Sequence, residues 1–234
     1  MNGPRSRKPL SPAETFQILR EGNLRFQNNV RSIESLSTQA RREELVAGQS
    51  PIAVVLSCSD SRAPAELLFD CGLGDLFVVR VAGNIVAPSL VGSVEFAVAK
   101  FGTPLVVVLG HTHCGAVRAA LDALRQRGNQ LTDNVNDIVD RMLPSITEIV
   151  TSGLPEAEVD RLAGRANVRV SAGHLRHGSR LLERAVEESR VVIVGAEYDI
   201  ETGVVDFFDG LDRLADHERR HPSVPPKPGG EPSP

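Results

Sequence analysis

The stretch LVVVLGHTHC, residues 105–114, decides the fold of this chain. Its first six residues are apolar or glycine, and short Val-rich runs of this kind are typical of strands buried on both faces of a parallel sheet. His111 follows the run directly, and Cys114 lies where a helical pattern opens. Because ligands bind beyond the carboxyl ends of strands in open α/β sheets, the stretch predicts a buried strand that delivers two metal-ligand side chains to that edge.

Four other runs complete the predicted sheet. Three are nearly all apolar and flanked by Gly, Pro or charge, and a fourth follows a turn and is expected as an antiparallel edge strand; in order they are Ile52–Ser57, Leu76–Ala82, Val191–Ala196 and Val204–Phe208. Helical patterns lie near 63–70, 88–101, 114–127, 134–151 and 173–189. The alternation predicts an α/β fold: an open, mostly parallel four-stranded sheet with an antiparallel edge strand, flanked by helices.

The N-terminal part of the chain predicts a projecting helix. Ser11 as N-cap, Pro12 at the first helical position and Glu14 in the first turn begin it, and we expect it to end near Asn28. Its large apolar residues spread over more than one face, so an isolated helix could not bury them all against its own domain; they are Phe16, Leu19, Leu24 and Phe26. A second helix is expected near 38–48.

Length and composition narrow the class of protein. The chain has 234 residues, of which 41% are hydrophobic, so we expect a flexible N-terminus (1–11), a single domain (12–220) and a disordered Pro-rich tail (221–234). A net charge of −4 argues against nucleic-acid binding. No apolar run is long enough to span a membrane, and no signal peptide follows the basic N-terminus, so we expect a cytoplasmic protein. Three cysteines are too few for a disulfide framework.

A second cluster of polar residues follows the strand expected over 52–57. It reads CSDSR, residues 58–62, and the carboxyl end of its strand should lie beside that of 105–110. Cys58, His111 and Cys114 then supply two thiolates and an imidazole, a recognised catalytic zinc shell with one open position. The Asp60–Arg62 pair beside the first thiolate has no role in a purely structural zinc site.

The other cysteine and histidines are given simpler interpretations. Cys71, in FDCG (69–72), has neither another ligand residue at a suitable spacing nor an Asp–Arg pair beside it, and it is expected to be structural. His113 could transfer protons or support a ligand, but a solvent-facing turn residue is favoured. His174 and His177 lie three apart on an expected helix; that spacing can bind metal, but an exposed basic face with Arg169 and Arg176 is favoured because no acid or Cys accompanies them.

The combined motifs resemble the β-class carbonic anhydrases over about residues 12–210. The resemblance rests on CSDSR (58–62) with GHTHCG (110–115), and it extends to EGNLRF (21–26), GDLFVVRVAGN (74–84), GSVEFAV (92–98) and VGAEYD (194–199). It implies a lyase, carbonate dehydratase, that interconverts carbon dioxide with bicarbonate and a proton. It also implies one zinc ion per subunit, held by Cys58, His111 and Cys114, whose bound hydroxide attacks carbon dioxide.

The resemblance assigns roles to further residues. Asp60 would accept a hydrogen bond from the hydroxide, and Arg62 would keep that carboxylate ionised through a bidentate contact. Gln49, Phe77 and the Gly115 amide would contact substrate. In some family members the Asp becomes a fourth zinc ligand; such members typically carry Trp where this chain has Val55, so an open site is expected. The family often has Tyr at the position of Phe96.

The resemblance also implies a homodimer or homotetramer with the site at the subunit boundary. Two other functions stay open. One is hydrolysis of carbon disulfide or carbonyl sulfide on the same fold. The other is a non-catalytic interaction module with a structural zinc site, which would need a fourth protein ligand such as Cys71 or His113.

Overall fold

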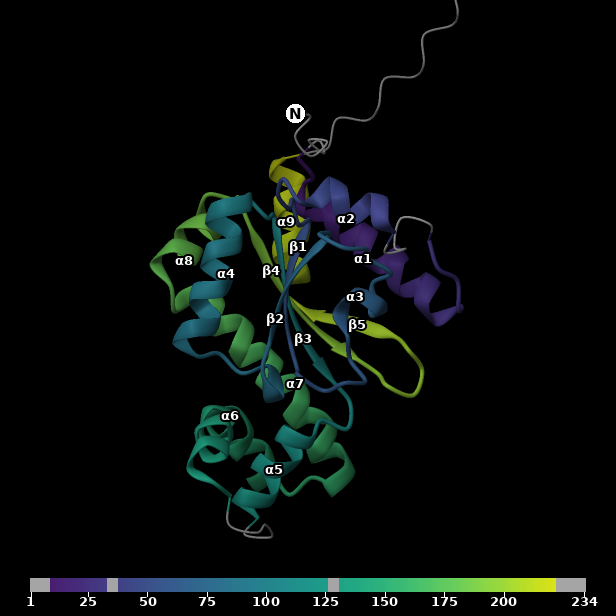
Figure 1. Ribbon diagram of the computed structural model, residues 1–234. Coiled ribbons are helices and arrows are strands. Elements are labelled where there is room, and N and C mark those ends of the chain that lie inside the picture. The colour runs from purple at the N-terminus through teal and green to yellow at the C-terminus, as the bar shows by residue number, and fades with distance from the viewer. Residues whose placement is uncertain (1–8, 33–37, 126–130, 222–234) are drawn as a thin grey trace, which may run out of the picture.

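Five strands form one sheet at the centre of the molecule (Figure 1). The computed structural model describes residues 9–32, 38–125 and 131–221. The strand order is β2-β1-β3-β4-β5, with β1 Ala53–Ser57, β2 Leu76–Arg80, β3 Leu105–His111, β4 Val192–Tyr198 and β5 Val205–Asp209. All neighbouring strands pair parallel except β4 and β5, which pair antiparallel. The predicted fold class is confirmed, including the antiparallel edge strand.

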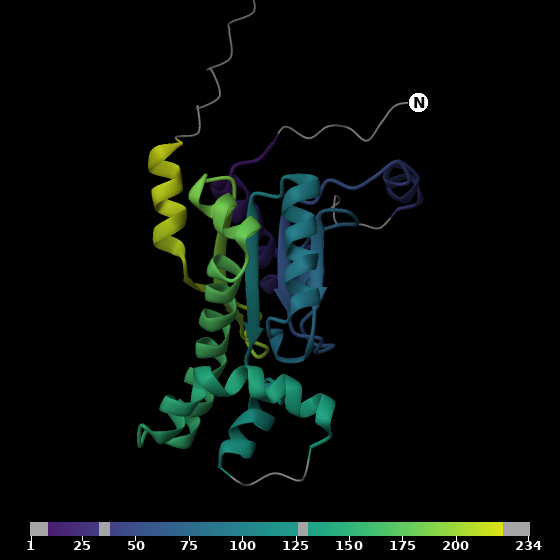
Figure 2. The same ribbon diagram turned by 90° about the vertical axis from the view of Figure 1, so that its left-hand side faces the viewer.

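Helices cover both faces of the sheet, and some of them extend beyond the carboxyl ends of its parallel strands (Figures 1 and 2). They are α1 Pro12–Gln27, α2 Gln39–Leu45, α3 Ala65–Leu68, α4 Pro88–Phe101, α5 Gly115–Leu124, α6 Asp133–Thr151, α7 Glu156–His177, α8 Arg180–Glu187 and α9 Leu211–Arg220, with a short 3-10 turn, η1, at Ala82–Asn84. Helices α5 and α6 form a lobe below the carboxyl ends of the parallel strands, and α7 rises from this lobe along the sheet (Figure 2).

Alternate residues of each central strand enter different cores, as strand geometry requires. In β3, Leu105, Val107 and Leu109 pack toward α1, α3 and α9. Val106 and Val108 pack toward α4, α7 and α8 on the other face. Both sets are buried, which explains why this strand is apolar throughout.

A third, smaller core lies between the sheet edge and the helical lobe. It contains Cys58 and Cys114 together with Val117, Met142 and Ile146 from α5 and α6. The two cysteines thus sit at the junction of the sheet with the lobe, in an apolar surrounding.

The helix expected over 173–189 is wrong as a single element. Helix α7 begins at Glu156 and ends at His177, and α8 starts at Arg180 after Ser179 caps it by accepting from the Leu182 amide at 3.2 Å. The prediction of an exposed basic face is wrong for Arg176. This residue is only 7% exposed, and it donates to the Ile193 carbonyl and to Asp209.

The N-terminal helix covers one face of the sheet. Leu19 is fully buried, whereas Leu24 is 57% exposed, so the helix does present apolar surface away from its own domain. Among the described residues, none of the helices combines the length and the apolar character needed to cross a membrane. The N-terminus expected to be flexible over 1–11 and the tail expected to be disordered over 221–234 fall outside the described residues at 1–8 and 222–234.

Candidate metal centre

Two neighbouring parallel strands bring the predicted ligands together. Cys58 follows the last residue of β1, and His111 is the last residue of β3, the strand that pairs with β1 in parallel. Cys114 is the N-cap residue of α5, three residues farther on. The turn between them is tight, since His113 adopts a positive φ of 56°. Residues more than fifty positions apart in the sequence therefore meet at one sheet edge.

The three side chains form a compact, buried group. Their potential ligand atoms all lie within 4.8 Å of one another, and the two sulfurs are 4.0 Å apart. Two sulfurs bound to one tetrahedral zinc at about 2.3 Å would be about 3.8 Å apart. No other group of three or more His, Cys, Asp or Glu residues in the described parts of the chain meets the same geometric condition.

The hydrogen bonds of His111 suit it for metal binding. Its Nδ1 lies 2.8 Å from the Thr112 carbonyl oxygen, and because a carbonyl can only accept, Nδ1 carries the proton. Nε2 is buried without a hydrogen-bond partner. A histidine ligand usually donates its other ring N–H to such a carbonyl. An orphaned, unprotonated nitrogen facing two sulfurs fits a zinc ion.

Backbone amides support both sulfurs. Cys58 Sγ accepts from the amides of Asp60 at 3.4 Å and Gly83 at 3.3 Å. Cys114 Sγ accepts from the amides of Ala116 and Val117 at the start of α5. These donors stabilise sulfur that carries negative charge, the form that binds zinc.

The two thiols share one proton between them. The hydrogen bond with Cys114 lowers the pKa of the Cys58 thiol to about 4, although burial opposes this shift. The pKa of Cys114 is raised well above its usual value, because its proton is held by the Cys58 sulfur and burial disfavours a second charge. Burial alone would lower the pKa of His111, but the nearby Cys58 sulfur and the Thr112 carbonyl raise it overall.

Asp60 lies beside the Cys58–His111–Cys114 group and accepts several hydrogen bonds from Arg62. Its Oδ1 accepts from the Arg62 amide and Nε, both at 2.9 Å, and its Oδ2 accepts from Nη2 at 2.8 Å. The Arg62 hydrogen bonds hold the pKa of this carboxyl well below its usual range. Oδ2 is 3.8 Å from His111 Nε2, so the carboxylate is near the group while both of its oxygens are engaged by Arg62.

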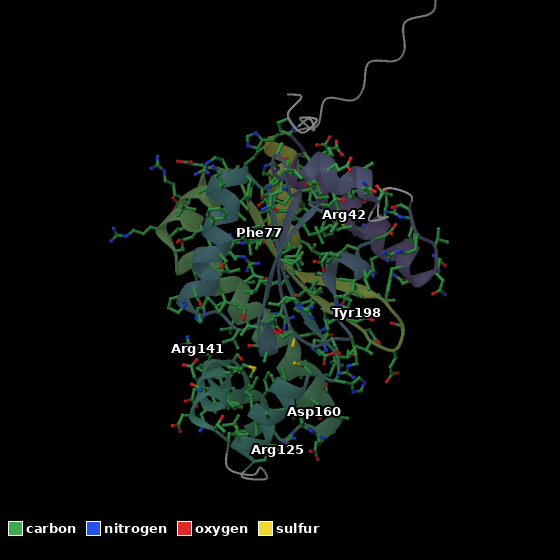
Figure 3. The ribbon with its side chains drawn as sticks, in the orientation of Figure 1. Arg42, Phe77, Arg125, Arg141, Asp160 and Tyr198 are labelled. Atoms are coloured by element: carbon green, nitrogen blue, oxygen red, sulfur yellow. The ribbon has the colours of Figure 1, made fainter. Side chains whose placement is uncertain are left out.

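The predicted substrate-binding residues are only partly brought to the site. Gly115 opens α5 next to Cys114 and is exposed. Gln49 precedes β1, whereas Cys58 follows it, and the five residues of the strand span about 16 Å. Phe77 pairs in register with Val54 and packs against Phe96 and Phe101. Figure 3 shows Phe77 beside the upper sheet, away from the lobe that Arg125 and Asp160 mark.

The remaining cysteine and histidines lie apart from the group. Cys71 is buried near the end of α3 and contacts the Phe69 carbonyl. His113 is exposed, and its Nε2 lies 3.2 Å from Glu201. Neither belongs to the three-residue group, so it contains no fourth His or Cys ligand from the described residues. His174 and His177 are exposed on α7.

Sequence reasoning missed two supports of the centre. The Gly83 amide reaches Cys58 because Gly83 adopts a φ of 70°, and a Cβ there would meet Met142 and Ala116 at about 3 Å. Arg80 donates to two carbonyls of the Cys58–Asp60 segment. The glycine in RVAGN (80–84), directly after a strand, is a signal in the sequence that this loop has a special conformation.

Comparisons with known proteins agree with this geometry. A family model described as carbonic anhydrase matches residues 53–205. "Carbonic anhydrase 2" of Mycobacterium tuberculosis is 39% identical over 193 residues, 82% of this chain and 91% of the relative. The solved β-carbonic anhydrase CcaA is 26% identical with a TM-score of 0.67, covering 83% of this chain and 91% of that one. A tetrameric β-carbonic anhydrase of Sordaria macrospora shares the fold: TM-score 0.63, 24% identity, coverage 71% and 85%.

Proposed function

Since the chain belongs to the β-class carbonic anhydrases, we propose that Cys58, His111 and Cys114 hold the zinc ion on which it hydrates carbon dioxide. The reaction is reversible and yields bicarbonate and a proton. When bound, the zinc ion supplies a Lewis acid that lowers the pKa of a water molecule to about 7, so that hydroxide can attack carbon dioxide near neutral pH. The observation that carries the assignment is the orphaned Nε2 of His111 facing two buried sulfurs.

Asp60 orients the attacking group in this proposal. A carboxylate that is ionised can only accept hydrogen bonds, so it fixes the direction of the hydroxide proton and leaves a lone pair aimed at the substrate carbon. Arg62 keeps Asp60 ionised, since its hydrogen bonds hold the pKa of that carboxyl below the usual range. The planar guanidinium also fixes the plane of the carboxylate.

The site is of the open type in this proposal, with Asp60 outside the ligand group. Its support is that both carboxylate oxygens accept hydrogen bonds from Arg62. A carboxylate that turned toward the metal would have to give up these charge-assisted bonds, which are roughly twice as strong as neutral ones. Val55 is fully buried in β1 and offers no polar group in place of the Trp found in closing members.

A second chain completes the substrate pocket. Gln49 and Phe77 are separated from Cys58 by most of the length of the sheet, so they cannot act at the centre of their own chain. The exposed Leu24 of α1, and the groove of about 650 Å³ that Ala13, Phe16 and Leu214 help to line, offer apolar surface to such a partner. We therefore assign a homodimer as the smallest active unit.

The assignment of the reaction is tested by stopped-flow hydration of carbon dioxide with zinc-loaded protein. The chain should accelerate hydration well above the uncatalysed rate, and Cys58→Ser should abolish the acceleration. Cys71→Ser is the matched control, because it makes the same change at a buried thiol outside the group, and it should keep most of the activity. Equal rates for the parent and Cys58→Ser would reject the site.

The proposed compartment is the cytoplasm. All three cysteines are free thiols, and Cys58 and Cys114 must stay reduced to bind metal. Reducing compartments keep thiols in this state. Cell fractionation with an antibody against the chain would check this.

A further inference from the structure

We propose that Arg80 is a positioning residue for the reaction, because its guanidinium holds the Cys58–Asp60 segment in place. Arg80 is the last residue of β2. Its Nε donates to the Cys58 carbonyl at 2.9 Å, and its Nη2 donates to the Asp60 carbonyl at 2.6 Å. One planar group thus bridges the backbone of a metal ligand and that of the residue that orients the attacking hydroxide.

The segment needs such a support because it leaves the sheet at this point. The ladder of β1 ends at Ser57. Beyond it the Ser59 amide donates to the Val81 carbonyl at 3.2 Å, and the Cys58 sulfur accepts from the Gly83 amide at 3.3 Å. The carbonyls of Cys58 and Asp60 lie beyond the strand pairing. Arg80 supplies a donor to each of them, and the Asp60 carbonyl also accepts from the Ala63 amide at 3.0 Å.

The segment is also tied on its other side. Arg62 grips the Asp60 carboxylate and donates from Nη2 to the His113 carbonyl at 3.2 Å. Arg80 therefore anchors the segment to β2, while Arg62 anchors it to the turn before α5. If the first anchor is lost, the Cys58 sulfur, the Asp60 amide that supports it and the Asp60 carboxylate can shift together.

The contacts of Arg80 separate this role from a general contribution to stability. Its hydrogen-bond partners are carbonyls, and within the described parts of the chain no ion pair includes it. Its side chain is exposed, so its removal opens no cavity in the core. Lys could not reproduce the contact, since an ammonium group lacks the planar fork that spans two acceptors.

The test compares Arg80→Ala and Arg80→Lys with Arg41→Ala in zinc-loaded protein. Arg41 is the matched control because its Nε and Nη2 also donate to a backbone carbonyl, that of Leu73, at the opposite end of β2. Both Arg80 variants should lower kcat about 10- to 100-fold, the range for lost support of metal ligands. KM should stay nearly unchanged, because Arg80 is not assigned to substrate.

Two readouts distinguish positioning from a structural effect. Millimolar guanidinium should restore part of the kcat of Arg80→Ala, since the ion can fill the space that the side chain leaves, and it should not raise the kcat of the parent or of Arg41→Ala. Zinc affinity, measured by competition with a chelator, should fall about tenfold or more in Arg80→Ala and stay unchanged in Arg41→Ala.

The proposal is overturned if Arg80→Ala matches Arg41→Ala in kcat and zinc affinity, or if its loss of kcat follows a loss of folded protein that guanidinium does not reverse. It rests on the metal site proposed above, and Cys58→Ser separates the two. An active Cys58→Ser variant would reject the site itself, whereas an inactive Cys58→Ser with an unaffected Arg80→Ala would reject only the role of Arg80.

Discussion

At the scale of single residues, the unequal acidity of the two thiols has a measurable consequence. Zinc binds thiolates, and Cys58, with a pKa of about 4, is already ionised at neutral pH. Cys114 has a raised pKa and keeps its proton, so zinc must displace it. Below the raised pKa of His111 a further proton must leave Nε2. We expect release of about two protons per zinc near pH 9, one from Cys114 and one from the zinc-bound water, whose pKa would be about 7. Toward acid the water keeps its proton, and His111 supplies the second one instead.

The direction in which zinc affinity changes with pH follows from this proton release. Each proton displaced makes zinc binding about tenfold weaker per unit fall in pH, so affinity should decrease steadily toward acid. Titration calorimetry in buffers of different ionisation enthalpy counts the protons. Release of about three protons near pH 9 would contradict the shared-proton pair, because it would mean that both thiols are protonated before zinc binds.

Arg62 offers a second prediction at this scale. Arg62→Lys keeps the positive charge but loses the paired contact from Nε and Nη2 to the Asp60 carboxylate. We expect kcat for carbon dioxide hydration to fall about tenfold, with folding unchanged because Arg62 is exposed. Arg118→Lys is the control, since Arg118 donates to Asp160 through Nη1 alone and lies 3.8 Å from Glu156, both at the protein surface and away from the metal group. Equal kcat values for the two variants would show that charge alone is enough.

At the scale of helices and strands, glycines in two helices should respond oppositely to the same change. In α1, a Cβ on Gly22 would lie 1.9 Å from the Phe69 carbonyl oxygen, a backbone atom that cannot rotate away. We expect Gly22→Ala to lower the free energy of unfolding by about 3 kcal/mol or more. In α7, a Cβ on Gly173 meets nothing within 4 Å, so Gly173→Ala should raise it by about 0.5–1 kcal/mol.

Urea titration of each variant measures both effects. The close approach at Gly22 is part of a clamp in which Asn23 donates to the Leu68 and Gly203 carbonyls and Arg25 pairs with Asp70. If Gly22→Ala were as stable as Gly173→Ala, α1 would not pack against α3 as described.

The same scale shows what the sequence could predict. Strands β1, β3 and β4 were predictable because both of their faces are buried and mainly apolar residues fit. Helix α7 was predicted only toward its C-terminal end, because its buried side is built from small or polar residues such as Ala163, Asn167 and Ser171. Asn167 and Ser171 donate to the Gly83 and Asn84 carbonyls, so polar residues there serve the loop behind Cys58. Helix α9 was missed because it is largely charged and buries mainly Leu214 and His217.

The ligands of the metal centre were predictable for a different reason. Parallel strands end at one edge, so a ligand after each of two neighbouring strands is enough to place them together. The supporting groups were not, since the amide of Gly83 and the guanidinium of Arg80 act through the path of the backbone.

At the scale of the whole molecule, the sheet itself separates the predicted parts of the site. Gln49 lies before β1 and the ligand group lies after it, about 16 Å farther along the strand. In the proposed dimer, Gln49 therefore contributes to the centre of the other copy. This predicts complementation between variants: Gln49→Ala chains lack the contact they lend to a partner, and Cys58→Ser chains lack their own metal centre.

A mixed dimer of these two variants contains one complete site, with the centre of the Gln49→Ala chain and Gln49 of the Cys58→Ser chain. Co-refolded mixtures should therefore exceed the mean activity of the two homodimers in stopped-flow hydration assays. A mixture of Cys58→Ser with His111→Ala is the control, because every site then lacks a ligand, and it should stay inactive. If the first mixture only matched the mean activity of the two homodimers, Gln49 would lie outside the partner's site, because pairing the two variant chains would then restore no activity.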